Sequence, residues 1–488
     1  MKDEMQLVAK TFKGLEDVLA EELRQLGAGD VTPGTRMVSF TGDKQMLYKA
    51  NFCCRTALKI LKPIVSFKAR DTDELYEEAK RFEWDTLLGA DETFAIDSTV
   101  NSEEFRHSKF VVYRVKDAIA DYYMEKYGRR PSIRLVGADM QLNVHIYNNE
   151  VTISLDSSGE SLYKRGYRVD QTEAPINEVL AAGLLLKAGW DGSQNLIDPM
   201  CGSGTFLIEA ALIATNTYPG IFRKSFAFER WKDFEPELLD EIYNDDSQER
   251  TFDYKIYGSD ISAKAIGIAT RNVKSAGVAK YVDLKVMPFE DYTEAPANGM
   301  LITNPPYGER LSLEDVDAFY DMIGSKLKNV FKGYHAWIIA HKPEHFNAIG
   351  LKPSTKLEVN NGALDCEFRE YVMFDGTFAE FRKQGRTIKG EKKERKADSG
   401  ERRAERGRRR DRREPPRNAL EREYRKPFGE RFKDKENREE RAERREPTKT
   451  ERFVRFRKPR LYSEEEVNRK GEVTMRHRHK KETDSSED

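Results

Sequence analysis

The chain has 488 residues, enough for about three domains with a sizeable core. Its formal net charge of -1 hides a division. Residues 391–488 hold 35 Lys and Arg against 25 Asp and Glu, a net of +10, which leaves -11 for residues 1–390. An acidic body with a basic appendage is typical of nucleic-acid binders.

The cysteine pattern and the hydropathy exclude several classes of protein. The four cysteines show no CxxC spacing, so neither a secreted disulfide framework nor a cysteine metal site is expected. The N-terminus, MKDEMQLVAK, has no hydrophobic signal core, and no apolar run approaches the roughly 18 residues of a membrane span. We therefore expect a cytoplasmic protein.

Residues 1–65 predict a small α+β domain of ferredoxin-like size. Apolar strands alternate with amphipathic helices, and Gly27 is the expected C-cap of the first helix. The expected strands are 6–10, 37–40 and 57–67, and the expected helices are 15–26 and 43–53.

Residues 66–156 predict a second α+β domain, with a hairpin that turns at Asn148 and Asn149. Next to its long amphipathic helix lie Arg106, His107 and Lys109, which could contact RNA phosphates. Each alone is more often a solvated charge, so the prediction depends on their grouping. The same domain also contains Arg114, Arg129, Arg130 and Arg134. The expected helices are 71–88 and 109–127, and the expected strands are 93–99, 142–147 and 151–155.

Residues 157–173 connect this half to the next domain and contain Tyr163–Arg168, with the sequence YKRGYR. Basic residues interleaved with tyrosines can pair with phosphates and stack on bases. We therefore predict RNA contacts for Lys164, Arg165, Tyr167 and Arg168, while a plain interdomain linker is a compatible alternative.

A third domain is expected over 174–385, and its first motif is Asp198–Thr205 (DPMCGSGT). The motif follows an expected strand at 195–198 and opens a helix at 206–214, a context in which a ligand can approach glycine backbone. The lysine of a P-loop and the third glycine of a dinucleotide fingerprint are both missing. Asp198 would repel a pyrophosphate, whereas it suits a ligand with a cationic amino-acid group.

Two further strands extend this site. Residues 255–260 end in Asp260, at a position where an acid typically pairs with ribose hydroxyls. Residues 281–287 lead to Glu290 and Asp291, where an adenine could lie. The aromatic-rich insertion 215–250 is expected to pack over the site or to form a simple helical cap.

The fourth strand ends in the sequence LITNPPYG, residues 301–308. After the apolar run, Pro305 and Pro306 fix a rigid corner at the ligand-binding edge of an α/β sheet. The Asn304 side-chain oxygen and the Pro305 carbonyl can each accept a hydrogen bond from an exocyclic amine. Such a pair of acceptors aims the nitrogen lone pair at an electrophile, and Tyr307 can stack on the heterocycle.

Together, Asp198–Thr205, Gly258–Asp260 and Asn304–Tyr307 resemble motifs I, II and IV of class I S-adenosylmethionine-dependent amino-methyltransferases. With Tyr163–Arg168 and the N-terminal half, residues 1–385 resemble THUMP-domain RNA methyltransferases of the RlmL/YpsC type. The resemblance implies a Rossmann-like catalytic domain, a THUMP domain over 66–156, and transfer of a methyl group to guanine N2 of 23S rRNA.

The same resemblance implies S-adenosyl-L-methionine as cofactor and ribosomal RNA of the large subunit as partner. The cysteine and histidine patterns predict no metal. No second strand-Asp-GxG unit follows residue 385, so a second methylation activity is not expected. The implied cofactor-binding residues are Asp198, Cys201, Gly202, Gly204, Thr205, Asp260, Glu290, Asp291 and Asn177.

Alternatives remain open at this stage. The same corner serves guanine-N2 methylation of tRNA and N6-adenine methylation, and a non-catalytic RNA-binding ribosome-assembly factor is a third interpretation. His341 and His345 have the i, i+4 spacing of metal ligands, but with no third ligand nearby a surface role is favoured. Residues 386–488 are rich in Lys, Arg and Glu and are expected to be a disordered tail that strengthens RNA binding.

Overall fold

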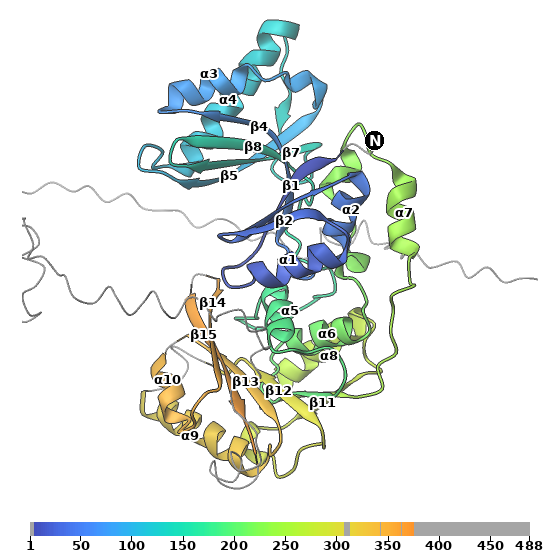
Figure 1. Ribbon diagram of the computed structural model, residues 1–488, viewed down its shortest axis with the longest axis vertical. Helices are drawn as coiled ribbons and strands as arrows, with labels where there is room; N and C mark the ends of the chain where they lie inside the picture. Colours follow the sequence, from blue (N-terminus) through green and yellow to red (C-terminus); the bar gives the residue numbers. More distant parts are fainter. Residues whose placement is uncertain (1–3, 307–312, 342, 363, 375–488) are drawn as a thin grey trace, which may run out of the picture. The chain divides into compact units, whose positions relative to one another are not determined.

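The computed structural model describes residues 4–306, 313–341, 343–362 and 364–374. Two sheets organise this part of the chain, one of eight strands and one of seven (Figure 1). Tyr307 and the tail at 386–488, both named in the sequence analysis, lie outside the described residues. None of the described helices combines the length and the apolar composition needed to cross a bilayer.

The eight-stranded sheet joins the two N-terminal domains. Its strand order is β2-β3-β1-β4-β8-β7-β5-β6, and β4 connects the halves. Lys59 to Leu61 of β4 pair with β1, and Leu61 to Lys68 pair with β8. The expected boundary at residue 65 therefore falls inside a strand. The bounds are β1 (Met5–Lys10), β2 (Gly29–Gly34), β3 (Met37–Gly42), β4 (Lys59–Lys68), β5 (Thr93–Asn101), β6 (Ser132–Ile133), β7 (Met140–Tyr147) and β8 (Glu150–Asp156).

The helices of this half follow the predicted pattern with one correction. The single helix expected over 71–88 ends at Lys80, because the chain turns back and buries Trp84 completely. The Trp84 indole N–H donates to the Ala79 carbonyl over 2.8 Å. The bounds are α1 (Glu16–Gln25), α2 (Lys44–Cys53), α3 (Thr72–Lys80), η1 (Trp84–Thr86) and α4 (Ser108–Tyr127).

The seven-stranded sheet has the order β11-β10-β9-β12-β13-β15-β14 and is parallel from β11 to β13. Strand β15 lies inside the sheet, because it pairs with β13 on one side and with β14 on the other. The bounds are β9 (Asn195–Asp198), β10 (Ile256–Asp260), β11 (Val282–Val286), β12 (Gly299–Thr303), β13 (His335–Ala340), β14 (Thr355–Asn361) and β15 (Leu364–Val372).

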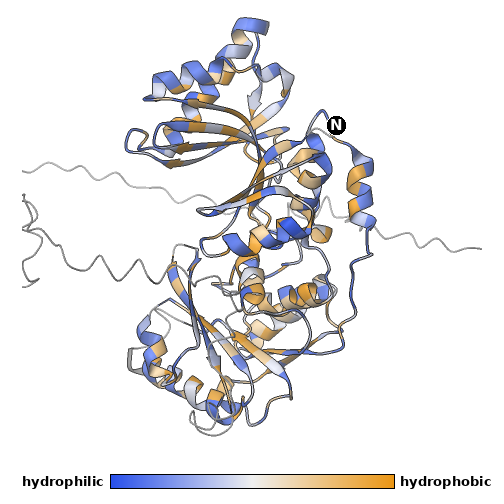
Figure 2. Ribbon diagram, viewed as in Figure 1, coloured by the Kyte–Doolittle hydropathy of each residue, from blue (hydrophilic) through white to orange (hydrophobic). Residues whose placement is uncertain are grey.

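Helices cover both faces of this sheet, as its continuous apolar strands require. Alternate residues of β12 point to opposite cores: Met300 and Ile302 to one, Leu301 to the other. On the first face lie α5 (Glu178–Lys187), α6 (Thr205–Ala214) and α8 (Ala263–Ser275). On the second face lie α9 (Leu313–Asn329) and α10 (Pro343–Ala348). Figure 2 shows α6 as largely apolar, in keeping with its complete burial. The predicted α/β class is confirmed.

The insertion after α6 packs on the N-terminal half. Phe228 stacks on Tyr48 of α2 with 4.2 Å between ring centroids, and Phe226 joins the same core. These aromatic side chains of the insertion therefore pack on the N-terminal half instead of over the site. Its elements are η2 (Pro219–Phe222), η3 (Ala227–Arg230) and α7 (Pro236–Asn244).

Candidate active site

Three of the predicted site residues meet at one edge of the seven-stranded sheet. Asp198 ends β9, Asp260 ends β10, and Asn304 follows β12. These strands are parallel neighbours in the order β10-β9-β12, so their carboxyl ends lie side by side. Ligands of open α/β sheets bind at this edge.

The glycine loop between β9 and α6 needs its glycines. Gly202 and Gly204 have φ of +52° and +80°, backbone angles that residues other than glycine rarely adopt. A Cβ at Gly204 would lie 3.2 Å from that of Ala269, whereas a Cβ at Gly202 would meet only Thr172 Oγ1 at 3.8 Å. Gly204 is thus needed for packing, while Gly202 leaves space for a ligand.

Asp260 is held by the backbone of the same loop. Its Oδ2 accepts a hydrogen bond from the Gly202 N–H over 3.0 Å, and its Oδ1 accepts one from the Ser262 N–H over 2.9 Å. Two backbone donors therefore fix the orientation of this carboxylate at the edge.

Asp198 is 1% exposed, and its Oδ1 accepts hydrogen bonds from Thr303 Oγ1 at 2.9 Å and from the Met200 N–H at 3.2 Å. Burial, together with the nearby Asp260 charge, raises the pKa of Asp198 to about 7. Among the described residues no Lys, Arg or His pairs with Asp198. A buried carboxylate of this kind gains most from a cation brought by a ligand.

Asn304 carries an unbonded acceptor. Its Oδ1 is buried and accepts no hydrogen bond within the described residues. A buried unsatisfied polar atom costs about 1–3 kcal/mol, so an N–H group of a ligand would relieve it. Pro305 beside it is buried and Pro306 is partly exposed.

A strap formed by residues 169–172 crosses the glycine loop. The Asn272 side chain on α8, itself 1% exposed, accepts from the Val169 and Asp170 N–H groups and donates to the Asp170 and Ser203 carbonyls. The Thr172 N–H donates to Ser203 Oγ over 2.9 Å. The sequence analysis missed Asn272 and Thr303, although a polar residue inside each buried apolar pattern was the available signal.

The other predicted cofactor residues are placed as follows. Asn177 is the N-cap of α5, and its Oδ1 accepts from the Val179 and Leu180 N–H groups. Burial raises the pKa of the Cys201 thiol. Glu290 and Asp291 are exposed in η4 (Phe289–Asp291), directly after β11.

Two of the four predicted RNA contacts at 164–168 are wrong, because Arg165 and Tyr167 are buried. Arg165 is 2% exposed and Tyr167 1%, and both donate hydrogen bonds to Glu209 Oε1 in the core, over 3.4 and 2.8 Å. Arg168 donates to Glu178 over 2.6 Å and to Thr205 Oγ1 over 2.9 Å. Arg165 and Tyr167 are therefore held inside the protein, whereas Arg168 is partly exposed and is engaged by Glu178 and Thr205. Lys164 is exposed and pairs with Glu160 over 2.6 Å.

The basic residues before and in α4 have a different setting. Arg106, His107 and Lys109 are exposed at the N-terminus of this 20-residue helix. Phe110 and Tyr113 beside them are 50% and 56% exposed. The helix dipole, the cationic side chains and the open aromatic rings together suit a phosphate-bearing polymer with bases that can stack. Of the other arginines in this domain, Arg114 pairs with Asp73 and Arg129 pairs with Asp91.

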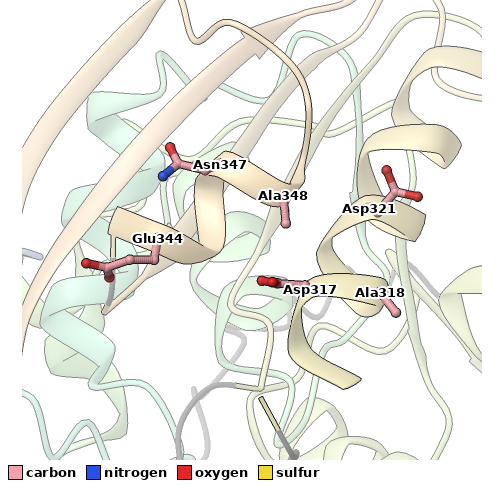
Figure 3. Close-up of a pocket in the computed structure, with 6 residues that line it drawn as sticks. All are labelled: Asp317, Ala318, Asp321, Glu344, Asn347 and Ala348. Atoms are coloured by element: carbon pink, nitrogen blue, oxygen red, sulfur yellow. The ribbon is translucent and has the colours of Figure 1, made fainter. Parts of the chain in front are cut away.

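A depression of about 600 Å³ lies between α9 and α10 and contains neither Asn304 nor Asp198 (Figure 3). It is lined by Asp317, Ala318, Asp321, Glu344, Asn347 and Ala348. These residues include three carboxylates and no basic side chain, so the depression does not suit RNA.

His345 was expected at the surface and is instead buried, with its ring centroid 5.0 Å from that of Tyr320. Within the described ranges no group of three or more His, Cys, Asp or Glu could hold a metal.

Known families match three segments of the chain. Residues 165–370 match the family described as RMKL-like, methyltransferase domain. Residues 69–156 match the THUMP domain, and residues 6–61 match the RlmL ferredoxin-like domain.

Individual relatives agree with these matches. A Synechocystis sp. protein named as an RNA methyltransferase is 36% identical over 369 residues, covering 75% of this chain and 96% of that protein. A ribosomal RNA large subunit methyltransferase K/L from Syntrophotalea carbinolica is 37% identical over 379 residues, covering 75% and 53%. The chain thus spans about half the length of the K/L relatives. The crystal structure of SMU.472, a methyltransferase complexed with SAH, has a TM-score of 0.67 at 29% identity, covering 77% and 100%. The chain belongs to the family of THUMP-domain RNA methyltransferases.

Proposed function

We propose that this protein transfers a methyl group from S-adenosyl-L-methionine to the exocyclic N2 of a guanine in 23S ribosomal RNA. The observation that carries the proposal is the buried Asn304 Oδ1, which accepts no hydrogen bond from the described residues and lies at the same sheet edge as the Asp198 and Asp260 carboxylates. An amide acceptor that needs an N–H donor and a buried acid that needs a cation match the two substrates of an amino-methyltransferase.

The residues at the sheet edge fit this cofactor. Asp198 would pair with its ammonium group and Asp260 with its ribose hydroxyls, while Gly202 allows the close approach that a side chain would block. Cys201, Gly204 and Thr205 shape the loop, and Glu290 and Asp291 lie where the adenine region would extend. When bound, S-adenosylmethionine supplies an electrophilic methyl group.

The NPPY corner would prepare the target nitrogen. Asn304 Oδ1 and the Pro305 carbonyl accept hydrogen bonds from the amine, which turns its lone pair out of the ring plane. Pro306 would keep the corner rigid, and a tyrosine at position 307 would stack on the base, a contact worth about 1–3 kcal/mol. Most of the rate gain would come from positioning.

The N-terminal half would bind the RNA while the target base is swung out of its stack. The exposed Arg106, His107 and Lys109 at the start of α4 support this role, with Phe110 as a stacking surface. The match of this chain to K/L relatives supports large-subunit ribosomal RNA as the substrate.

A methyl-transfer assay tests the proposal. The full chain is incubated with tritiated S-adenosylmethionine and total RNA from cells that lack its gene, and ribosomal and transfer RNA are separated before nucleoside analysis. Label in large-subunit RNA as N2-methylguanosine is the expected result. Label in tRNA or in N6-methyladenosine would support methyl transfer to an amine but overturn the proposed substrate. If both substrates bind and no label is transferred, the proposed enzymatic activity is overturned.

A further inference from the structure

Thr303, the last residue of β12, lies between the two halves of the proposed site. Its side chain is completely buried, so it touches neither solvent nor a ligand at the edge. Its hydroxyl donates to Asp198 Oδ1 over 2.9 Å, and the next residue along the chain is Asn304. One side chain therefore links the strand that carries the target-base corner to the acid on the neighbouring strand.

The hydrogen bonds of Asp198 fall on one oxygen. Thr303 Oγ1 and the Met200 N–H both donate to Oδ1, and within the described ranges no hydrogen bond reaches Oδ2. The carboxylate is thus fixed through Oδ1, which leaves Oδ2 for a group from outside the chain.

We propose that Thr303 is a positioning residue whose hydroxyl holds the Asp198 carboxylate in place for the ammonium group of the cofactor. The inference rests on the proposed function. A threonine methyl group fills the buried space, whereas the hydroxyl has the separate task of donating to the acid. Losing the hydroxyl and losing the methyl group should therefore have different consequences.

The charge state of Asp198 provides a readout that packing alone would not change. Burial raises the pKa of Asp198 to about 7, and the Thr303 hydrogen bond opposes that shift. The other titratable groups that face Asp198 are Asp260, Cys201 and Tyr292. Burial raises the pKa of the Cys201 thiol and of Tyr292, so both stay neutral near pH 7. Affinity for a cationic ligand should fall as the pH drops through the Asp198 pKa. Removal of the Thr303 hydroxyl should raise the pH at which this loss of affinity occurs.

The test compares Thr303→Val, which keeps the shape and loses the donor, with Thr303→Ser, which keeps the donor and loses a methyl group. Binding of S-adenosylhomocysteine to the full chain is measured by calorimetry between about pH 5 and pH 9, the span in which a carboxyl with this pKa titrates. For T303V we expect roughly tenfold weaker binding at neutral pH. The acid limb, meaning the part of the pH profile where affinity falls as the pH drops, should lie about one pH unit higher than in the wild type. T303S should keep the wild-type limb.

A second ligand separates the possible failures. 5′-Methylthioadenosine has the nucleoside and the sulfur but no ammonium group, so T303V should bind it as the wild type does. An unchanged acid limb in T303V, or equal shifts in T303V and T303S, would overturn the inference while leaving the proposed function intact. Wild-type protein that binds neither nucleoside would overturn both. If T303V does not fold, Thr303→Cys, which keeps a weaker donor, takes its place. Its acid limb should lie at a pH between those expected for the wild type and T303V, and a limb at the wild-type pH would overturn the inference.

Discussion

Two short stretches combine polar side chains with tyrosines, and the protein uses them differently. In Tyr163–Arg168, the Arg165 guanidinium and the Tyr167 hydroxyl both bond to Glu209. At the corner after β12, Asn304 Oδ1 is also buried but accepts no hydrogen bond within the described residues. The first stretch ties the linker to α6, and the second leaves an acceptor for a ligand.

An unbonded atom is informative only together with its place in the fold. Glu209 Oε2 is also buried without a partner in the described chain, yet Glu209 lies inside the core with no exposed surface. Asn304 lies at the carboxyl edge of a parallel sheet, where ligands bind. The comparison therefore predicts that mutations at the corner alter turnover, whereas mutations in the linker alter stability.

The largest effect is expected from Asn304→Ala. Loss of the acceptor should lower kcat by roughly 10²–10³-fold or more, as removal of one preorganised hydrogen-bonding group does in other enzymes. Affinity for S-adenosylhomocysteine should stay nearly unchanged, because Asp198 and Asp260 remain. Asn195→Ala is the matched control: its side chain also forms hydrogen bonds, but at the opposite end of β9. A turnover near normal in N304A would remove Asn304 from the mechanism.

Arg165→Met should destabilise the fold instead. It removes one partner of a buried ion pair and leaves Glu209 without its guanidinium, which costs about 3–5 kcal/mol. Urea unfolding measures the loss, and Lys164→Met, at an exposed neighbouring position, should change stability by less than about 0.5 kcal/mol. If R165M weakened RNA binding at unchanged stability, Arg165 would belong to the RNA interface after all.

Asp198→Asn should separate stability from ligand binding. The folded-state pKa of Asp198 is about 7 against an ordinary 3.8, so the buried acid favours the folded state below about pH 4 and loses this contribution as the pH rises to 7. Above pH 7 the uncharged asparagine should therefore stabilise the ligand-free protein, by up to about 4 kcal/mol. Cofactor affinity should fall about 10–100-fold, since a charge-assisted contact is lost. A D198N protein that is less stable than wild type at about pH 8 would contradict this account of the buried charge.

The geometry of this sheet edge could be predicted from sequence because its signals are local. A strand, a glycine pair and a proline pair fix backbone geometry within a few residues, so β9 was expected at its observed bounds, Asn195–Asp198. The neighbourhood of Asp198, Asp260 and Asn304 then follows from the strand order of α/β sheets.

Other features depend on partners that are distant in sequence. Arg165 looks like a surface residue until Glu209 is brought beside it. The aromatic insertion after α6 gives no sign that its partner is Tyr48 in the N-terminal half. Strand β4 reads as one strand of one domain, and only its pairing with both β1 and β8 shows that it joins two.

The smallest effects are expected at the predicted RNA surface, where exposed charges act through phosphates. Arg106→Ala and Lys109→Ala should each weaken RNA binding a few-fold and lower the slope of log affinity against log salt by about one. Arg129→Ala is the matched control, because Arg129 is also exposed but pairs with Asp91 over 2.8 Å. Filter binding at several salt concentrations separates the variants. Equal slopes for all three would mean that the start of α4 does not contact the RNA backbone, whereas loss of slope only in R106A and K109A would place phosphates at this helix end.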